Sequence, residues 1–408
     1  MTLKQQRIVA SLDVGSNKIV CLIGYINAMG KVFIKGIGHQ QSRGIQNGRI
    51  TNKKEAEKSI ISTISLAEKI AGYSIQSITI NISTSEVSSS TINTNLQLNG
   101  KEVKNTNITA ILKDIRDILK KEGKEIIHLM PLQYALDNNI VESPYGMEAE
   151  NLRITFHLLS TTKNNLVKIK DCMKTMMVNI NNYVSNGYAT SLSVLEETEK
   201  ELGVMILDIG YNSTNISIVY NNKYVYEGNI SIAGDNITKD ISTILKTTYL
   251  TAEKIKVMNT NFTISKKDED ELIKINIDTD EDFMASQNKI SLINNIAKAR
   301  IEEIVELALA KIKEKQLQNV PKYIVITGGT ALIPGIDMFI SSIAGLEARV
   351  GYNDNFNIQD RKMAVELKSP IYSVSMGILR FIQNKYKDGG TDSEDNSIFL
   401  NFLKKILT

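Results

Sequence analysis

The sequence contains no tryptophan and is poor in proline, cysteine and histidine. With 5 prolines among 408 residues, it is neither a collagen-like chain nor a proline-rich disordered chain. The two cysteines, Cys21 and Cys172, cannot build a disulfide framework, and the three histidines, His39, His128 and His157, lack the spacing of zinc ligands. We therefore expect a reduced, intracellular chain that depends on its hydrophobic core for stability.

An excess of one charge and long hydrophobic runs are also missing. Lys and Arg number 48 against 45 Asp and Glu, so the net charge of +3 argues against a protein that coats nucleic acid. No apolar run reaches the ~18 residues that span a bilayer, and the N-terminus lacks the apolar segment of a secretory signal. A length of 408 residues, 42% of them hydrophobic, predicts two to four domains.

One motif occurs twice in the chain. Residues 12–20 read LDVGSNKIV, and residues 207–218 read LDIGYNSTNISI. In each copy a β-branched run is followed by a polar, glycine-containing turn and a second apolar run, which is typical of a hairpin in a buried sheet. The repeat predicts a duplicated α/β fold.

The segments between and after the two copies also carry clear patterns. Residues 51–71 have helical apolar spacing and end at Gly72, and residues 75–82 form a predicted strand. From residue 83 to about 161, segments of strand-like apolar and polar alternation come before and after a helix with an apolar stripe. This pattern predicts an inserted α+β subdomain. In the second half, a periodic helix over 290–315 leads to a strand at 323–326 and the turn TGGT at 327–330.

The two hairpins and the TGGT turn favour a phosphate-binding site. Backbone amides of a Gly- and Ser-rich bend can hold a phosphate, and the strand-end carboxylates Asp13 and Asp208 can hold Mg²⁺ through water. Gly328 and Gly329 would let the backbone approach a nucleotide closely. Two facing hairpins could therefore clamp a polyphosphate.

These motifs, in this order, resemble those of the actin, DnaK-type chaperone and sugar-kinase superfamily. Within it, the chain is most similar to the FtsA family of bacterial cell-division actin homologues. The similarity covers nearly the whole chain, including GIQNGRI at 44–50, AEKIAGY at 67–73, SPYGM at 143–147, EKELGV at 199–204, AGDNITKDI at 233–241 and AEKIK at 252–256.

The resemblance implies an ATP and Mg²⁺ site between two lobes. Its nucleotide-binding residues would be Asp13, Gly15, Ser16, Asn17, Lys18, Asp208, Gly210, Gly234, Glu253, Lys254, Gly328, Gly329 and Thr330, and Asp13 and Asp208 would hold the metal. FtsA relatives usually carry DIGGGTTD in the second hairpin, whereas Tyr211, Asn212 and Asn215 interrupt that pattern here. Because a tyrosine replaces a glycine that normally allows positive φ, we expect a reshaped phosphate arm, retained or weakened ATP binding, and very slow or absent hydrolysis.

The last residues read IFLNFLKKILT at 398–408. As a helix, this segment places its apolar side chains on an arc of roughly 200°, with lysines beside them, which suits an anionic lipid interface. The predicted membrane-binding residues are Ile398, Phe399, Leu400, Phe402, Leu403, Lys404, Lys405, Ile406 and Leu407. FtsA proteins are similar in ending with a linker and an amphipathic helix.

The predicted organisation follows the resemblance. Subdomain IA comprises 1–83, 162–195 and 366–384; subdomain IC is inserted at 84–161; subdomain IIA comprises 196–235 and 314–365; subdomain IIB comprises 236–313; a flexible linker covers 385–396 and the amphipathic helix 397–408. The resemblance implies a filament-forming scaffold, peripheral to the cytoplasmic face of the inner membrane at the division site. It would bind the C-terminal tail of FtsZ through subdomain IIB and later division proteins through subdomain IC.

Two alternatives belong to the same superfamily. A sugar-kinase-like phosphotransferase would need a catalytic carboxylate in the cleft, and Asn186 and Gly187 in the connecting helix give it no support. A PilM-like pilus-assembly protein is disfavoured by the Pro-x-Gly-Met turn and the C-terminal anchor.

Overall fold

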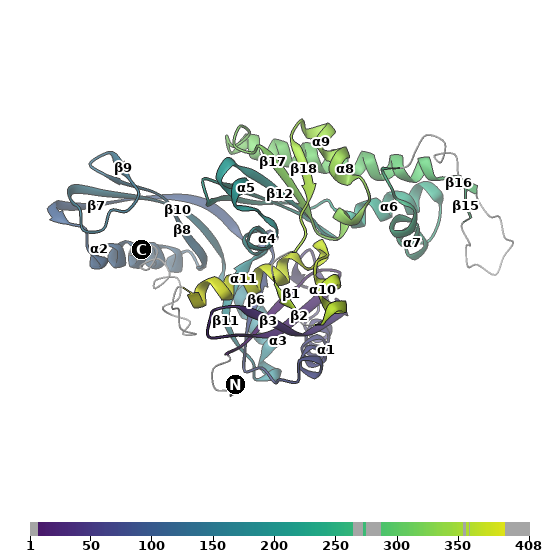
Figure 1. Ribbon diagram of the computed structural model, residues 1–408, viewed down its shortest axis with the longest axis horizontal. Coiled ribbons are helices and arrows are strands. Elements are labelled where there is room, and N and C mark those ends of the chain that lie inside the picture. The colour runs from purple at the N-terminus through teal and green to yellow at the C-terminus, as the bar shows by residue number, and fades with distance from the viewer. Residues whose placement is uncertain (1–6, 264–271, 275–286, 354–355, 359, 388–408) are drawn as a thin grey trace.

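The computed structural model describes residues 7–263, 272–274, 287–353, 356–358 and 360–387. They form an actin-like α/β fold of two lobes with a subdomain inserted in the first lobe (Figure 1). Both lobe sheets share a five-strand order, in which a three-stranded antiparallel meander continues into two parallel strands, and the first-lobe sheet has one further edge strand. The duplication predicted from the repeated hairpin is therefore confirmed.

The first-lobe sheet has the order β11-β6-β1-β2-β3-β19. Its strands are β1 (Arg7–Val14), β2 (Lys18–Ile26), β3 (Val32–Gln41), β6 (Ser77–Ile82), β11 (Asn179–Ser185) and β19 (Asn357–Ile358), and a small hairpin joins β4 (Ile45–Gln46) to β5 (Arg49–Ile50). Alternate side chains of β1 enter two cores. Leu12 packs towards helices α1 (Lys53–Ala71) and α3 (Lys163–Met173), whereas Val9 packs towards α10 (Arg361–Leu367) and α11 (Ser373–Lys387).

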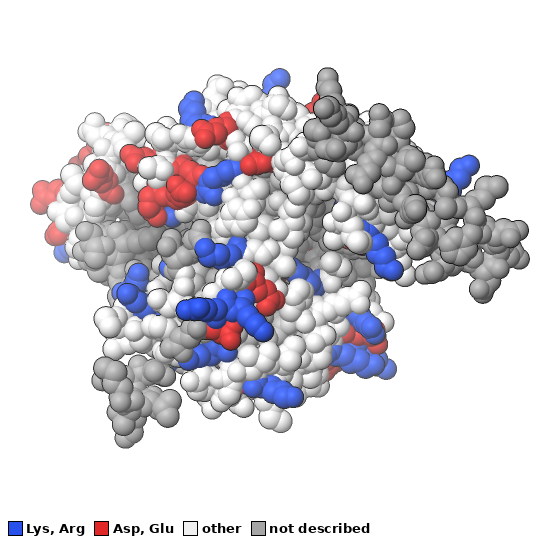
Figure 2. Space-filling view, turned by 45° about the vertical axis from the view of Figure 1, so that its right-hand side comes forward, with Lys and Arg blue, Asp and Glu red and all other residues white. Residues whose placement is uncertain are grey.

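The inserted subdomain extends from the first lobe (Figure 1). Its sheet, β7-β10-β8-β9, comprises β7 (Ser88–Glu102), β8 (Lys124–Leu136), β9 (Asn139–Val141) and β10 (Glu148–Thr162). Helix α2 (Asn105–Lys121) buries the predicted apolar stripe against this sheet. Acidic side chains gather at this end of the molecule (Figure 2), among them the exposed Glu102, Glu142, Glu148 and Glu150.

The second-lobe sheet has the order β14-β13-β12-β17-β18. Its strands are β12 (Val204–Ile209), β13 (Thr214–Tyr220), β14 (Lys223–Ile230), β17 (Tyr323–Thr327) and β18 (Glu347–Val350). One face packs on helices α6 (Gly234–Leu245), α7 (Tyr249–Asn259), α8 (Ile290–Glu314) and α9 (Ile336–Ala344). The lobe also contains α5 (Glu197–Leu202) and the short pair β15 (Leu272–Lys274) and β16 (Gln287–Lys289).

Two helices lie between the lobe sheets (Figure 1). Helix α4 (Asn186–Val194) leads from the first lobe to the second, and α11 packs beside it. A Cβ on Gly377 of α11 would lie 1.8 Å from the carbonyl oxygen of Ala189 in α4. Only glycine therefore permits this close crossing at the junction of the lobes.

Short 3-10 turns complete the described elements. They are η2 (Thr84–Glu86), η3 (Lys174–Met176), η4 (Gly329–Leu332) and η5 (Pro370–Tyr372). The turns η4 and η5 follow β17 and α10, and both contribute to a cavity between the lobes. The predicted membrane helix at 398–408 lies outside the described residues. Among the described residues, no helix is both long enough and apolar enough to cross a bilayer.

Candidate functional site

The first predicted phosphate hairpin joins β1 to β2. The amide of Gly15 donates to the carbonyl of Lys18 at 3.0 Å and closes the turn. Asp13 is buried at the end of β1, where its Oδ1 accepts a hydrogen bond from Asn81 Nδ2 at 3.0 Å. The Ser16 hydroxyl accepts a hydrogen bond from the Gly48 amide at 2.9 Å. The turn and its carboxylate are thus held by neighbouring elements of the first lobe.

The second hairpin, between β12 and β13, has the same geometry. The amide of Gly210 donates to the carbonyl of Ser213 at 3.1 Å, and Asn215 Nδ2 donates to the buried Asp208 at 3.1 Å. Neither Tyr211 nor Asn212 has a positive φ. This turn therefore accepts both side chains without backbone strain.

Tyr211 ties this hairpin to two helices of the second lobe. Its hydroxyl lies 2.6 Å from the hydroxyl of Tyr249 in α7, which donates to Asp235 Oδ1 of α6 at 2.6 Å. The Asp235 amide also donates to the Tyr211 carbonyl at 2.8 Å. Tyr211 thus links the second hairpin to α6 and α7.

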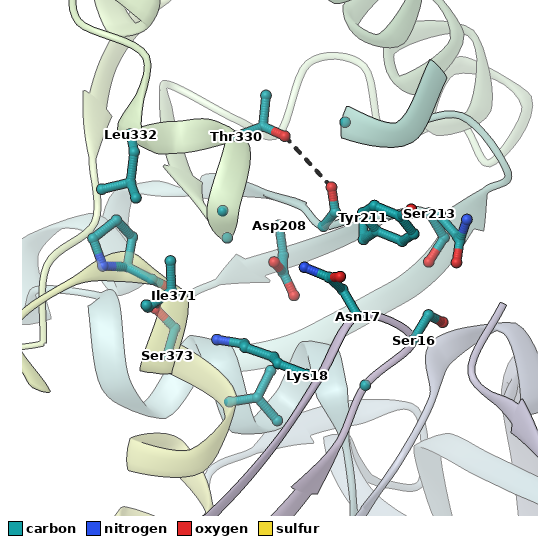
Figure 3. Close-up of a pocket in the computed structure, with 18 of the residues that line it drawn as sticks. Ser16, Asn17, Lys18, Asp208, Tyr211, Ser213, Thr330, Leu332, Ile371 and Ser373 are labelled. Carbon is teal, nitrogen blue, oxygen red and sulfur yellow. Dashed lines mark hydrogen bonds between the residues drawn. The ribbon is translucent and has the colours of Figure 1, made fainter. Parts of the chain in front are cut away.

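The two hairpins face each other across a cavity of about 540 Å³ between the lobes (Figure 3). Of the predicted nucleotide-binding residues, the cavity is lined by Asp13, Gly15, Ser16, Asn17, Lys18, Asp208, Gly210, Gly234, Glu253, Gly328, Gly329 and Thr330. Tertiary folding therefore brings together three motifs that are far apart in the sequence.

The charged groups at the hairpin end of the cavity are buried and incompletely paired. Burial raises the pKa of Asp13 to about 6, and burial also raises the pKa of Asp208. Burial lowers the pKa of Lys18, whose ammonium is buried and forms no hydrogen bond with the described residues. A buried ammonium without an acceptor is costly, so this end of the cavity is suited to an anion.

The TGGT turn that follows β17 lines the cavity beside the second hairpin, where Thr330 Oγ1 lies 3.4 Å from the Gly210 carbonyl oxygen. Gly328 has a φ of +85°, and a Cβ there would lie 2.5 Å from Asp208 Oδ1. A Cβ on Gly329 would meet no heavy atom within 4 Å, although Gly329 lines the cavity. The backbone is therefore bare where a bound molecule could approach it.

One predicted site residue lies elsewhere. Lys254 is exposed and does not line the cavity, whereas Lys256 does. Lys256 Nζ bonds Glu253 Oε2 at 2.8 Å and the Gly234 carbonyl at 3.1 Å. Residues three apart share a helix face, so Glu253 pairs with Lys256 and not with Lys254.

Sequence reasoning also missed cavity residues outside the motifs. Among them are His39, Lys256, Pro334, Ile371 and Ser373. The helical spacing of Glu253 and Lys256 could have identified Lys256. The others come from β3, the segment after η4, η5 and α11, and no local pattern marks them.

Comparison with known proteins identifies the family. The protein-family model described as "Cell division protein FtsA" matches residues 205–377. A second family model, described as "SHS2 domain inserted in FTSA", matches residues 84–160. The chain is 28% identical to the cell division protein FtsA of Agrobacterium fabrum (strain C58 / ATCC 33970) over 393 residues, covering 93% of this chain and 88% of the relative. This chain belongs to the FtsA family. It is also 27% identical to FtsA of Pseudomonas aeruginosa over 395 residues, covering 96% of this chain and 93% of that relative.

Solved structures share the fold at low sequence identity. The "PilM-PilN type IV pilus biogenesis complex" matches with a TM-score of 0.66 and 12% identity over 92% of this chain and 98% of that chain. MreB5 of Spiroplasma citri bound to ADP matches with a TM-score of 0.58 and 12% identity, covering 93% and 98% of the two chains. These likenesses confirm the actin-like fold, and the sequence relatives are FtsA cell-division proteins.

Proposed function

We propose that this FtsA family member binds ATP with Mg²⁺ and polymerises into a scaffold that tethers the FtsZ ring to the inner membrane. The observation that carries the nucleotide part is the ammonium of Lys18, buried without a hydrogen-bond acceptor among the described residues of the interlobe cavity. A phosphate oxygen would supply that acceptor. The bare backbone at Gly329 leaves room for the nucleoside.

The chain's own residues have distinct roles in this proposal. The hairpin amides and Lys18 bind phosphate, and Asp13 and Asp208 hold Mg²⁺ through water, which neutralises the phosphate charge. Gly234, Glu253 and the TGGT turn surround the adenosine. Because the cavity lies between the lobes, nucleotide binding favours their closure, and closed subunits assemble into filaments.

Nucleotide binding is tested with purified full-length protein and fluorescent ATP and ADP. We expect Mg²⁺-dependent binding that Lys18→Met weakens at least 10-fold. As a control, Lys322→Met removes the same charge from an exposed position outside the cavity and should leave binding unchanged. Absence of binding by the wild-type protein would refute the nucleotide role. Steady-state turnover around 10 s⁻¹ would instead support the phosphotransferase alternative over a slowly hydrolysing scaffold.

Membrane attachment is proposed to come from residues 398–408, which lie outside the described residues. A short amphipathic helix holds lipid weakly, and polymerisation multiplies the attachment. Deletion of 398–408 should release the protein from anionic liposomes in co-sedimentation. Phe399→Asp should do the same, whereas Asn401→Asp, the same charge on the polar side, should retain most binding. Unchanged co-sedimentation after the deletion would refute the anchor.

For the FtsZ tail, α7 offers an apolar face within the proposed subdomain IIB. Leu250, Val257 and Met258 are 73%, 72% and 80% exposed, and positions seven and eight apart share a helix face. We expect Met258→Asp to abolish binding of an FtsZ C-terminal peptide. Met338→Asp, at an exposed position in α9, is the control. Equal binding by both variants would place the tail elsewhere.

The inserted subdomain is the proposed contact for later division proteins. Its exposed acidic end (Figure 2) suits a positively charged segment of a partner.

Filament formation and lipid binding are best measured together, by liposome co-sedimentation with and without ATP followed by negative-stain microscopy. Filaments on lipid only with nucleotide are the expected result.

A further inference from the structure

Beside the cavity, Lys18 contacts an aromatic ring that none of the nucleotide motifs includes. The ring centroid of Tyr372, at the end of η5, lies 4.9 Å from Lys18 Nζ. Tyr372 is only 1% exposed. An ammonium over the face of an aromatic ring is attracted by the ring quadrupole, and the attraction increases when both groups are out of water.

Two further residues fix the orientation of this ring. The Tyr372 hydroxyl donates to Glu366 Oε1 of α10 at 2.5 Å, and His39 Nδ1 lies 3.1 Å from the same hydroxyl oxygen. Because the hydroxyl proton is used on Glu366, His39 must donate its Nδ1 proton to the Tyr372 oxygen. Burial, with Glu366 adding to it, raises the pKa of Tyr372, so the hydroxyl stays protonated. Donation to a carboxylate also leaves the ring more electron-rich and therefore a better partner for a cation.

The contact decides where the ammonium of Lys18 lies. Asp13 and Asp208 both attract Lys18 electrostatically, yet Lys18 Nζ forms no hydrogen bond with either carboxylate or with any other described residue. An ammonium paired with those carboxylates would compete with Mg²⁺ for them and would no longer be available to phosphate. The ring of Tyr372 offers the ammonium an attractive position that uses none of the carboxylate oxygens.

We propose that Tyr372 is a positioning residue that holds the ammonium of Lys18 for the phosphates of the nucleotide and keeps it off Asp13 and Asp208. This inference rests on the proposed nucleotide function. Tyr372 acts through Lys18 and has no direct contact with the nucleotide. Glu366 and His39 hold the ring in place.

The first test separates the phosphates from the nucleoside. Tyr372→Leu should weaken ADP and ATP binding by about 3- to 30-fold, the range of a desolvated cation–π contact. Adenosine binding should be unchanged, because Lys18 serves only the phosphates. Tyr372→Phe keeps the ring and should recover most of the ADP affinity. Equal losses for adenosine and ADP would overturn the proposal by indicating a general collapse of the cavity.

A double-mutant cycle tests whether the effect passes through Lys18. In a Lys18→Met background, Tyr372→Leu should cause no additional loss of ADP affinity. Leu379→Ala, in the same buried core but outside the cavity lining, controls for simple destabilisation and should leave ADP affinity unchanged. An undiminished effect of Tyr372→Leu in the Lys18→Met background would overturn the proposal. If the wild-type protein binds neither ADP nor ATP, the proposed function itself fails, which is a different outcome.

Discussion

Glu227 is a buried carboxylate that connects the two lobes. It lies in β14 of the second lobe and is 4% exposed. Its Oε1 accepts from Thr84 Oγ1 at 2.9 Å, and its Oε2 accepts from Ser185 Oγ and from Tyr224 OH, each at 2.7 Å. Thr84 and Ser185 belong to the first-lobe side, so two of these bonds cross the junction. We expect substitution of Glu227 to be among the most damaging changes outside the cavity.

The expected size follows from what each variant removes. Glu227→Ala leaves three buried hydroxyl groups without their carboxylate acceptor and opens a cavity. Each buried donor left unsatisfied costs about 1–3 kcal/mol, so the total loss should be about 3 kcal/mol or more. Glu227→Gln keeps the volume but directs an amide N–H₂ at neighbouring donors, with a cost of about 1–3 kcal/mol. The exposed Glu347→Ala of β18 should change stability by less than about 0.5 kcal/mol.

Urea unfolding followed by circular dichroism measures these differences. The order of stability should be wild type, then Glu227→Gln, then Glu227→Ala. An alanine variant within about 1 kcal/mol of wild type would show that the carboxylate network does not stabilise the junction. The burial of Glu227 between the lobes would then need a reason other than stability.

Three further predictions concern the cavity and the inserted subdomain. Tyr211→Phe removes the 2.6 Å hydroxyl bond to α7 and should lower the free energy of unfolding by about 1 kcal/mol; no change in urea midpoint would show that the bond is not stabilising. Burial lowers the pKa of His157 from 6.5 to about 4. As the pH falls, His157 is therefore protonated in the unfolded chain before it is protonated in the folded one. The free energy of unfolding should decline by up to ~3 kcal/mol between pH 6.5 and 4. His157→Gln should flatten this decline in urea unfolding at pH 7 and 5, and parallel curves would contradict the assignment. Gly328→Ala should destabilise the fold by about 1–3 kcal/mol through its positive φ and its clash with Asp208. Gly329→Ala should leave stability intact but weaken ADP binding. Both variants are measured by urea unfolding and by ADP titration. A larger loss of stability for Gly329→Ala than for Gly328→Ala would contradict these roles of the two glycines.

Much of the site depends on local patterns, which explains why the sequence predicted it. A hairpin closes on itself through neighbouring residues, so the turns around Gly15 and Gly210 and the carboxylates before them could be recognised from alternation and turn chemistry. Their repetition predicted the duplicated sheets. The amphipathic helices of the inserted subdomain and second lobe were equally visible, because apolar spacing is a property of the helix itself.

The conformation of the second turn was harder to foresee. The resemblance predicted that Tyr211 reshapes this turn, and the structure shows that φ at that position is not positive. The link from Tyr211 through Tyr249 to Asp235 depends on how α6 and α7 pack beside the hairpin. No spacing rule within one segment predicts such a contact.

The sequence by itself determined that this protein has two glycine-containing hairpins, a glycine turn and an inserted subdomain, because each is encoded by patterns within its own segment. The tertiary structure decided that Lys256 lines the cavity in place of Lys254, that Glu227 joins the lobes, and that Tyr372 lies over Lys18. These contacts join residues far apart in the chain. They exist only because sheet and helix packing fixes which buried charges meet and which remain available to a ligand.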